Sequence, residues 1–149
     1  MNAKDYINKK LNEVVISQPE IDFFTTGGCI DFAYAYQDIF GEDNELIAIW
    51  GNYDPEDEDA IPELIHVFCI NSNGQKGVGV DVKGWQDYKK LVDSYSEYFI
   101  DDAHITERTD KKEIKNAIDS SGGDLEISQD GYNKATLLIK NNIEFYKPR

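Results

Sequence analysis

Apolar residues recur at helical spacing in the first forty positions of the chain. The segment 5–15 places its apolar residues near one face of a helix, and Pro19 marks the end of that helix. A glycine-containing turn at 25–28 precedes a second helix predicted over 29–40, whose apolar residues recur every three or four positions. Gly41 follows this helix as a stop signal. The pattern predicts two helices before any strand.

Three apolar runs then predict strands. They cover 45–50, 64–70 and 77–82. An acidic loop at 52–59 separates the first two strands, and a turn containing Asn73-Gly74 separates the second from the third. Short strands joined in succession by loops are typical of an antiparallel sheet.

The C-terminal part returns to helical spacing. Helices are predicted over 85–99, 110–120 and 130–141, with a short strand at 143–146. Asp110 and Glu113 have the spacing of a capping box, and the glycines at 122–123 end that helix. We predict one α+β domain of residues 1–149, in which the helix that begins at Cys29 packs on a small antiparallel sheet and further helices follow.

The charge is concentrated in one stretch. The 149 residues carry 29 acids and 15 bases, a net charge of −14, and no lysine or arginine lies between Lys10 and Lys76. This segment holds the whole net charge, which disfavours direct binding to nucleic acid or to an anionic membrane. No apolar run reaches the roughly 20 residues of a membrane span, and the polar N-terminus does not resemble a secretion signal. Two cysteines form no disulfide framework, so a cytoplasmic protein is expected.

Cys29 stands at a position that favours a reactive thiol. At a helix N-terminus the positive end of the helix dipole and free backbone N–H groups stabilise a thiolate. Gly27 and Gly28 allow a substrate carbonyl to approach the backbone, whose N–H groups could bind an oxyanion. Asp31 opposes this, because a nearby carboxylate disfavours a second anion. The alternative interpretation is that Cys29 is a small buried residue.

His66 and Asp81 are predicted to face each other across a hairpin. If Asn73-Gly74 is a two-residue type I′ turn, His66 lies directly opposite Asp81. Opposed side chains have Cβ atoms about 4.5–5.5 Å apart, which lets a carboxylate orient an imidazole. Cys69 lies three residues from His66 and therefore points to the other face, as a core residue. The alternative interpretation is a histidine with a backbone partner and an aspartate facing water.

Three segments together resemble the papain-like cysteine peptidase superfamily, above all its compact bacterial and phage members. They are the sequences Thr-Gly-Gly-Cys-Ile-Asp-Phe-Ala at 26–33, Ile-His-Val-Phe at 65–68 and Val-Asp-Val-Lys-Gly at 80–84. The resemblance implies a papain-like core over about 20–90 and a helical extension over about 85–149. It implies a hydrolase or acyl transferase acting on a peptide or amide bond, without a cofactor. By this resemblance Cys29 is the nucleophile, His66 the general base and acid, and Asp81 the residue that orients the histidine.

The chain departs from the family at the oxyanion donor. Many relatives have a glutamine a few residues before the cysteine, whereas Gln18 lies eleven residues before Cys29 and is followed by Pro19. Asn52, which follows the first predicted strand, is an alternative donor. The expected substrate is a protein or peptide, and the acidic first half suggests a basic one.

Two other functions stay open. A non-enzymatic acidic protein could mimic nucleic acid and act as an inhibitor, immunity or anti-defence factor, or a papain-like scaffold could have lost catalysis and only bind. Under the first of these the partner would bind an acidic cluster in the 52–59 loop: Asp54, Glu56, Asp57, Glu58 and Asp59. This loop lacks the glycine and glutamate of an EF-hand, and strand parity separates Cys69 from His66, so no metal site is predicted.

Overall fold

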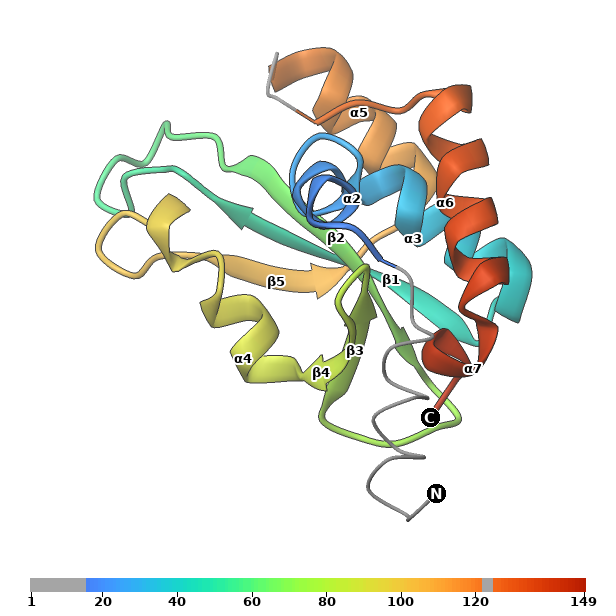
Figure 1. Cartoon of the computed structure of the whole chain (residues 1–149). Coiled ribbons are helices and arrows are strands. Elements are labelled where there is room, and N and C mark those ends of the chain that lie inside the picture. Colours follow the sequence, from blue (N-terminus) through green and yellow to red (C-terminus); the bar gives the residue numbers. More distant parts are fainter. Residues whose placement is uncertain (1–15, 122–124) are drawn as a thin grey trace.

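The computed structural model describes residues 16–121 and 125–149 (Figure 1). The helix predicted over 5–15 and the glycine stop signal at 122–123 lie outside the described residues. The helices are α2 (Gln18–Phe24), α3 (Cys29–Phe40), α4 (Tyr88–Asp93), the 3₁₀ turn η1 (Ser96–Tyr98), α5 (Lys111–Ser121), α6 (Gln129–Asn141) and α7 (Ile143–Tyr146). The strands are β1 (Asn44–Gly51), β2 (Glu63–Asn71), β3 (Val78–Asp81), β4 (Gly84–Asp87) and β5 (Ile105–Arg108).

The fold is α+β, as predicted. The five strands form one antiparallel sheet in the order β4-β3-β2-β1-β5. Strands β1 and β2 are central and buried on both faces, which explains why they read as nearly continuous apolar runs. The predicted helix at 29–40 and the first three strands are confirmed to within about two residues at each end.

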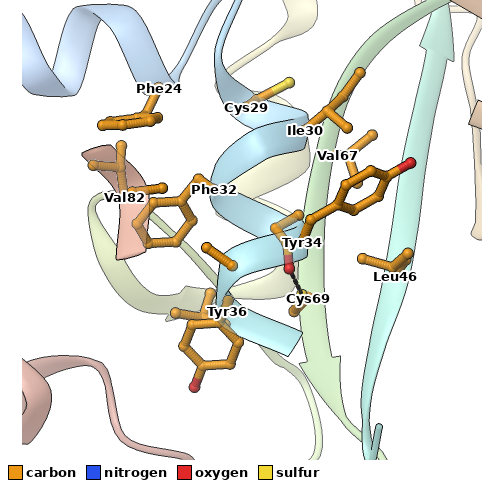
Figure 2. Close-up of a cluster of buried hydrophobic side chains, with 14 of the residues drawn as sticks. Phe24, Cys29, Ile30, Phe32, Tyr34, Tyr36, Leu46, Val67, Cys69 and Val82 are labelled. Carbon is orange, nitrogen blue, oxygen red and sulfur yellow. Dashed lines mark hydrogen bonds between the residues drawn. The ribbon is translucent and has the colours of Figure 1, made fainter. Parts of the chain in front are cut away.

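Helices cover both faces of the sheet, so the molecule has three layers (Figure 1). Helix α3 packs on β1 and β2, with α2 and α6 against it, and α5 contacts β2. The larger group of buried apolar side chains, the α3-side core, lies between these helices and the sheet (Figure 2). The smaller α4-side core lies on the other face and comprises Ile47, Ile49, Phe68, Leu91, Val92 and Tyr95.

Pro19 begins a helix here and does not end one. It stands in the first turn of α2, where a missing N–H costs nothing and its fixed φ is suited to a helix. Ser17 and Glu20 form a complete capping box around it. Helix α2 differs from the prediction, in which Pro19 is only a stop signal.

The helix predicted over 85–99 is wrong in its first part and interrupted in its second. Residues 84–87 pair with β3 as strand β4, through a tight turn at 82–83 that joins Asp81 to Gly84. Gly84 has φ +92°, a conformation that glycine adopts without strain. Helix α4 begins only at Tyr88, capped by the Asp87 side chain. Pairing with a neighbouring strand overrides the helical spacing of the aromatic residues.

The strand predicted at 143–146 is also wrong, because these residues form the short helix α7. The hydroxyl of its Tyr146 donates to the carbonyl of Val82 at 2.5 Å, and the Tyr146 carbonyl accepts from Tyr36 at 2.6 Å. Helix α5 agrees with its prediction, and the N–H of Glu113 donates to the Asp110 carboxylate at 2.8 Å. The C-terminal helices therefore close over the end of β3 and the far end of α3.

Candidate functional site

Cys29 is the first residue of α3, at the end of a tight turn. Gly28 is the N-cap, and a Cβ there would lie 2.4 Å from a ring carbon of the half-exposed Phe23, so a larger residue would displace that ring. The Cys29 side chain is 1% exposed, and Figure 2 shows it on the first turn of the helix. The Gly28 N–H is bonded to the Phe23 carbonyl at 2.9 Å, whereas the Cys29 N–H makes only a long contact of 3.4 Å with Thr26. The Cys29 N–H is therefore held more weakly within the turn than the Gly28 N–H.

His66 lies on β2 at a β-bulge. Opposite it, Ile49 pairs with His66 and Trp50 pairs with Leu64, so Ile65 is the extra residue. Side chains at 64 and 67 belong to the α3-side core, while those at 65 and 68 pack in the α4-side core. Strict alternation of faces thus breaks at His66, and bulges of this kind redirect side chains. No pattern along the chain predicts this bulge.

Asp81 holds the imidazole of His66, as predicted. The His66 Nε2 lies 3.2 Å from Oδ2 of Asp81, and both side chains are buried. The other carboxylate oxygen, Oδ1, accepts from the Lys83 N–H at 2.9 Å and from the Gln86 amide at 2.7 Å. With both oxygens engaged, the carboxylate has a fixed orientation from which it accepts the Nε2 proton.

The predicted register of this hairpin, however, is wrong. Cys69 pairs with Val80, a shift of two residues from the pairing that a two-residue turn at Asn73-Gly74 requires. The turn is wider, and the Gln75 N–H donates to the carbonyl of Arg149 at 2.8 Å instead of closing a hairpin. A shift of two residues keeps every side chain on its face, so Asp81 reaches His66 as a diagonal neighbour.

The second ring nitrogen of His66 is the unusual feature. Nδ1 is buried and makes no hydrogen bond of ordinary geometry among the described residues. Burial by itself lowers the pKa of His66, but the negative charge of Cys29 and the hydrogen bond to Asp81 outweigh it and raise the pKa to about 9. Cys29 and Asp81 therefore both favour the imidazolium form of this histidine.

Tyr95, which lies within the helix predicted over 85–99, also belongs to this site. It lies between α4 and η1, with its ring stacked on His66 at 4.2 Å between centroids. Its hydroxyl lies 3.2 Å from Nε2 of His66 and 3.5 Å from the Thr25 carbonyl. Nothing in the sequence distinguishes this tyrosine from the other aromatic residues at helical spacing.

Asp31 is hydrogen-bonded through its carboxylate to Ser128 and is not an unpaired charge beside Cys29. Its carboxylate is 1% exposed and accepts from the Ser128 N–H at 3.1 Å, at the start of α6. Burial raises the pKa of Asp31, and the hydrogen bonds from Ser128 lower it. Gly131 lies against the same carboxylate, where a Cβ would come within 2.1 Å of Oδ2. The role of Asp31 is to join α3 to α6.

A pocket of about 240 Å³ lies against residues that precede Cys29 and His66 in the chain, although neither of those two side chains lines it. Its walls include Thr25 and Thr26, which precede Cys29, and Leu64 and Ile65, which precede His66. Asn52, with φ +51°, also lines it and donates from Nδ2 to Glu63 at 3.0 Å. A larger hollow of about 570 Å³ between α2 and α6 is lined by none of the residues next to Cys29 or His66.

The remaining candidates lie apart from this group. Gln18 is exposed at the start of α2, and its amide donates to Asp22 at 2.8 Å. The carbonyl of Gly27 accepts from the Glu126 N–H at 3.0 Å. The acidic residues at 54 and 56–59 are all exposed, in two successive turns closed by the carboxylates of Asp54 and Asp57. Cys69 is fully buried on the α3 side, where its Sγ lies 3.6 Å from the carbonyl of Ala33.

Within residues 16–121 and 125–149, no three His, Cys, Asp or Glu side chains are grouped so that they could hold a metal ion. No described helix is long and apolar enough to cross a membrane. Comparison of the chain with family models, with curated proteins and with solved structures gives no match.

Proposed function

We propose that this chain is a papain-like thiol hydrolase or acyl transferase that acts on a peptide or amide bond. The observation that carries the proposal is the buried His66, held at Nε2 by Asp81 at 3.2 Å and left without an ordinary hydrogen bond at Nδ1. A buried nitrogen without a partner costs free energy, so it calls for an explanation in function. The Cys29 thiol, which already acts on the charge of this ring, is the partner we assign to it.

The proposed reaction transfers an acyl group to sulfur and then to water or an amine. Proton transfer from the Cys29 thiol to Nδ1 of His66 gives a thiolate–imidazolium pair, and the thiolate sulfur of this pair attacks the substrate carbonyl carbon. The tetrahedral intermediate collapses, the C–N bond breaks, and His66 returns the proton to the leaving amine. Water or an amine, deprotonated by His66, then attacks the thioester and releases the thiol.

Two groups of the chain could stabilise the oxyanion of that intermediate. One is the Cys29 N–H, whose contact with Thr26 is long at 3.4 Å. The other is Asn52, because one hydrogen of its Nδ2 amide bonds to Glu63 and the other is left for a substrate oxygen. Since Cys29 is 1% exposed, the acyl group would approach through the pocket between the 25–26 turn and the start of β2.

The order of Cys29, His66 and Asp81 along the chain, on a helix start and on two neighbouring strands, is that of the papain-like superfamily. This resemblance supports the assignment of roles. The chain departs from the family at the aromatic residue often found shortly after the nucleophile, which is present only as Phe32, packed in the α3-side core.

The proposal is tested with p-nitrophenyl acetate, an activated acyl donor that needs no knowledge of the substrate. The wild-type chain should release p-nitrophenolate in a burst and carry one acetyl group on Cys29, located by peptide mapping. Cys29→Ser should lose the burst and the adduct, whereas Cys69→Ser, which changes the other buried cysteine, should keep both. Equal behaviour of the two variants would contradict the proposal.

We also propose that the natural substrate is a basic protein or peptide segment. The acidic 52–59 loop joins two walls of the pocket, Asn52 and Glu63, and all its acids are exposed. A non-enzymatic acidic binding protein is the second candidate, and the same exposed charge favours it.

One loop variant separates these two uses of the acidic residues. It carries Asp54→Asn, Glu56→Gln, Asp57→Asn, Glu58→Gln and Asp59→Asn, and the amides can still close both turns. For an enzyme, turnover of lysine-containing acyl donors should fall while acylation by p-nitrophenyl acetate stays unchanged. For a binding protein, affinity for a polylysine peptide should fall in this variant and be untouched by Cys29→Ser.

Both effects should weaken as salt rises, because exposed charges are screened. The matched control neutralises five exposed acids elsewhere: Asp93, Glu97, Asp102, Glu107 and Asp119. If this control changes turnover or binding as much as the loop variant does, the loop has no specific role.

A further inference from the structure

Tyr95 connects the two parts of the chain that carry the proposed base and nucleophile. Its hydroxyl lies 3.2 Å from Nε2 of His66 on β2 and 3.5 Å from the carbonyl of Thr25, four residues before Cys29. Its ring lies nearly parallel to the imidazole, at 21°, with 4.2 Å between centroids. One hydroxyl group therefore meets both the imidazole of His66 and the turn that leads into Cys29.

We infer that Tyr95 is a positioning residue of the site, which fixes the His66 ring against the turn that leads into Cys29. The inference rests on the proposed function, and it deepens that function by adding a residue the papain-like pattern does not include. The Tyr95 hydroxyl links two separate parts of the fold, because His66 Nε2 lies on β2 and the Thr25 carbonyl lies in the turn before α3. A tyrosine that only filled the core would need the ring and no contact with Nε2.

The hydroxyl acts on one particular proton. Asp81 and Tyr95 both lie 3.2 Å from Nε2, so the Nε2–H is shared between the carboxylate and the phenol oxygen. The phenol O–H donates to the Thr25 carbonyl. The phenol oxygen therefore accepts the Nε2–H of the imidazole. This arrangement keeps the proton on Nε2 and leaves Nδ1 free for the thiol.

The phenol stays protonated in this environment. Burial raises the pKa of Tyr95, and the negative charges of Asp81 and Cys29 raise it further. The titratable groups that act on His66 from the elements packed against it are Cys29 from α3, Asp81 from β3 and Tyr95 after α4. A neutral hydroxyl that accepts from the ring stabilises the imidazolium more than the imidazole, since hydrogen bonds to charged groups are stronger.

Tyr95→Phe tests the inference, because it keeps the stacked ring and removes only the hydroxyl. The pKa of His66, followed by the ¹⁵N shifts of its ring, should fall in this variant. Alkylation of Cys29 by iodoacetamide at pH 6.5 should slow by about ten-fold, the loss of one hydrogen bond to a charged group. Tyr95→Leu, which also removes the stacked ring, should slow the alkylation of Cys29 further.

Tyr88→Phe is the matched control, since Tyr88 lies in α4 against Phe68 in the same α4-side core. It should leave both the His66 titration and the alkylation rate at their wild-type values. An unchanged His66 titration in Tyr95→Phe would overturn the inference, whatever the effect on stability. If wild-type Cys29 shows no alkylation that depends on His66, the proposed function fails, while the His66 titration still decides the role of Tyr95.

Discussion

Replacing His66 by alanine is expected to slow alkylation of Cys29 at pH 6.5 by about 100-fold or more, the range of one general acid–base group. In the wild type the charge of Cys29 and the hydrogen bond to Asp81 keep the pKa of His66 at about 9. The imidazolium therefore persists through neutral pH, where it can stabilise a thiolate that an ordinary cysteine, with a pKa of about 8.5, does not form. Without it, the alkylation rate should rise only as the pH approaches that ordinary value.

The measurement is the rate of iodoacetamide labelling from pH 5 to 10, read by intact mass and peptide mapping. Cys69 is the internal control, because it is fully buried, burial raises its pKa, and its Sγ lies against the carbonyl of Ala33. Asp81→Asn should lie between wild type and His66→Ala, since it keeps a hydrogen bond to Nε2 and removes the charge. A labelling profile that is the same in wild type and His66→Ala would exclude the proposed pair.

The raised pKa of His66 also makes the stability of the fold depend on pH. Because the pKa of His66 is raised above its value of 6.5 in the unfolded chain, its contribution is complete below pH 6.5 and is lost as the pH rises through about 9. Labelling of the variants is therefore compared at pH 6.5, where this contribution to the wild-type fold is present.

Tyr146→Ala is expected to lower the free energy of unfolding by about 3–5 kcal/mol, the cost of removing a fully buried large aromatic side chain. Tyr146 is 0% exposed, packs on Phe32 at 5.3 Å between ring centroids and donates to the Val82 carbonyl at 2.5 Å. Val82 follows Asp81 directly, so the hydroxyl also anchors the backbone that carries the orienting carboxylate. The loss is measured by urea unfolding, and Cys29 labelling should slow along with it.

Ile143→Ala is the control on the same short helix, because Ile143 is 39% exposed. It should cost less than about 1 kcal/mol and leave labelling unchanged. If Tyr146→Ala costs no more than this control, the C-terminal helices do not stabilise the site, and the prediction is wrong.

Helices and strands that depend on the spacing of neighbouring residues could be predicted from the sequence. Helix α3 begins at Cys29 and ends before Gly41 as predicted, because its apolar spacing and flanking glycines are properties of neighbouring residues. Strands β1 and β2 are predicted for the same reason, being long apolar runs between polar loops. The contact of His66 with Asp81 is confirmed even though the register is shifted, since a slip of two residues preserves the faces.

Elements that depend on pairing with distant partners could not be predicted. Strand β5 is short and largely exposed, and it exists because the edge of β1 offers it hydrogen bonds. Strand β4 has the spacing of a helix and becomes a strand through its turn with β3. The wide turn after β2 is held by the C-terminal carbonyl of Arg149, which no local pattern reveals.

By itself, the sequence determined the α+β class, the place of Cys29 at a helix start and the pairing of His66 with an acid on the next strand. Each follows from residues within one helical turn or one strand pair, where spacing fixes which side chains can meet. Only the tertiary structure decided that a bulge lies at His66, that Asp31 is committed to α6, and that Tyr95 covers the imidazole. The Tyr95–His66 and Asp31–Ser128 contacts join residues 29 and 97 positions apart. Packing of whole layers sets them, and no periodicity along the chain encodes them.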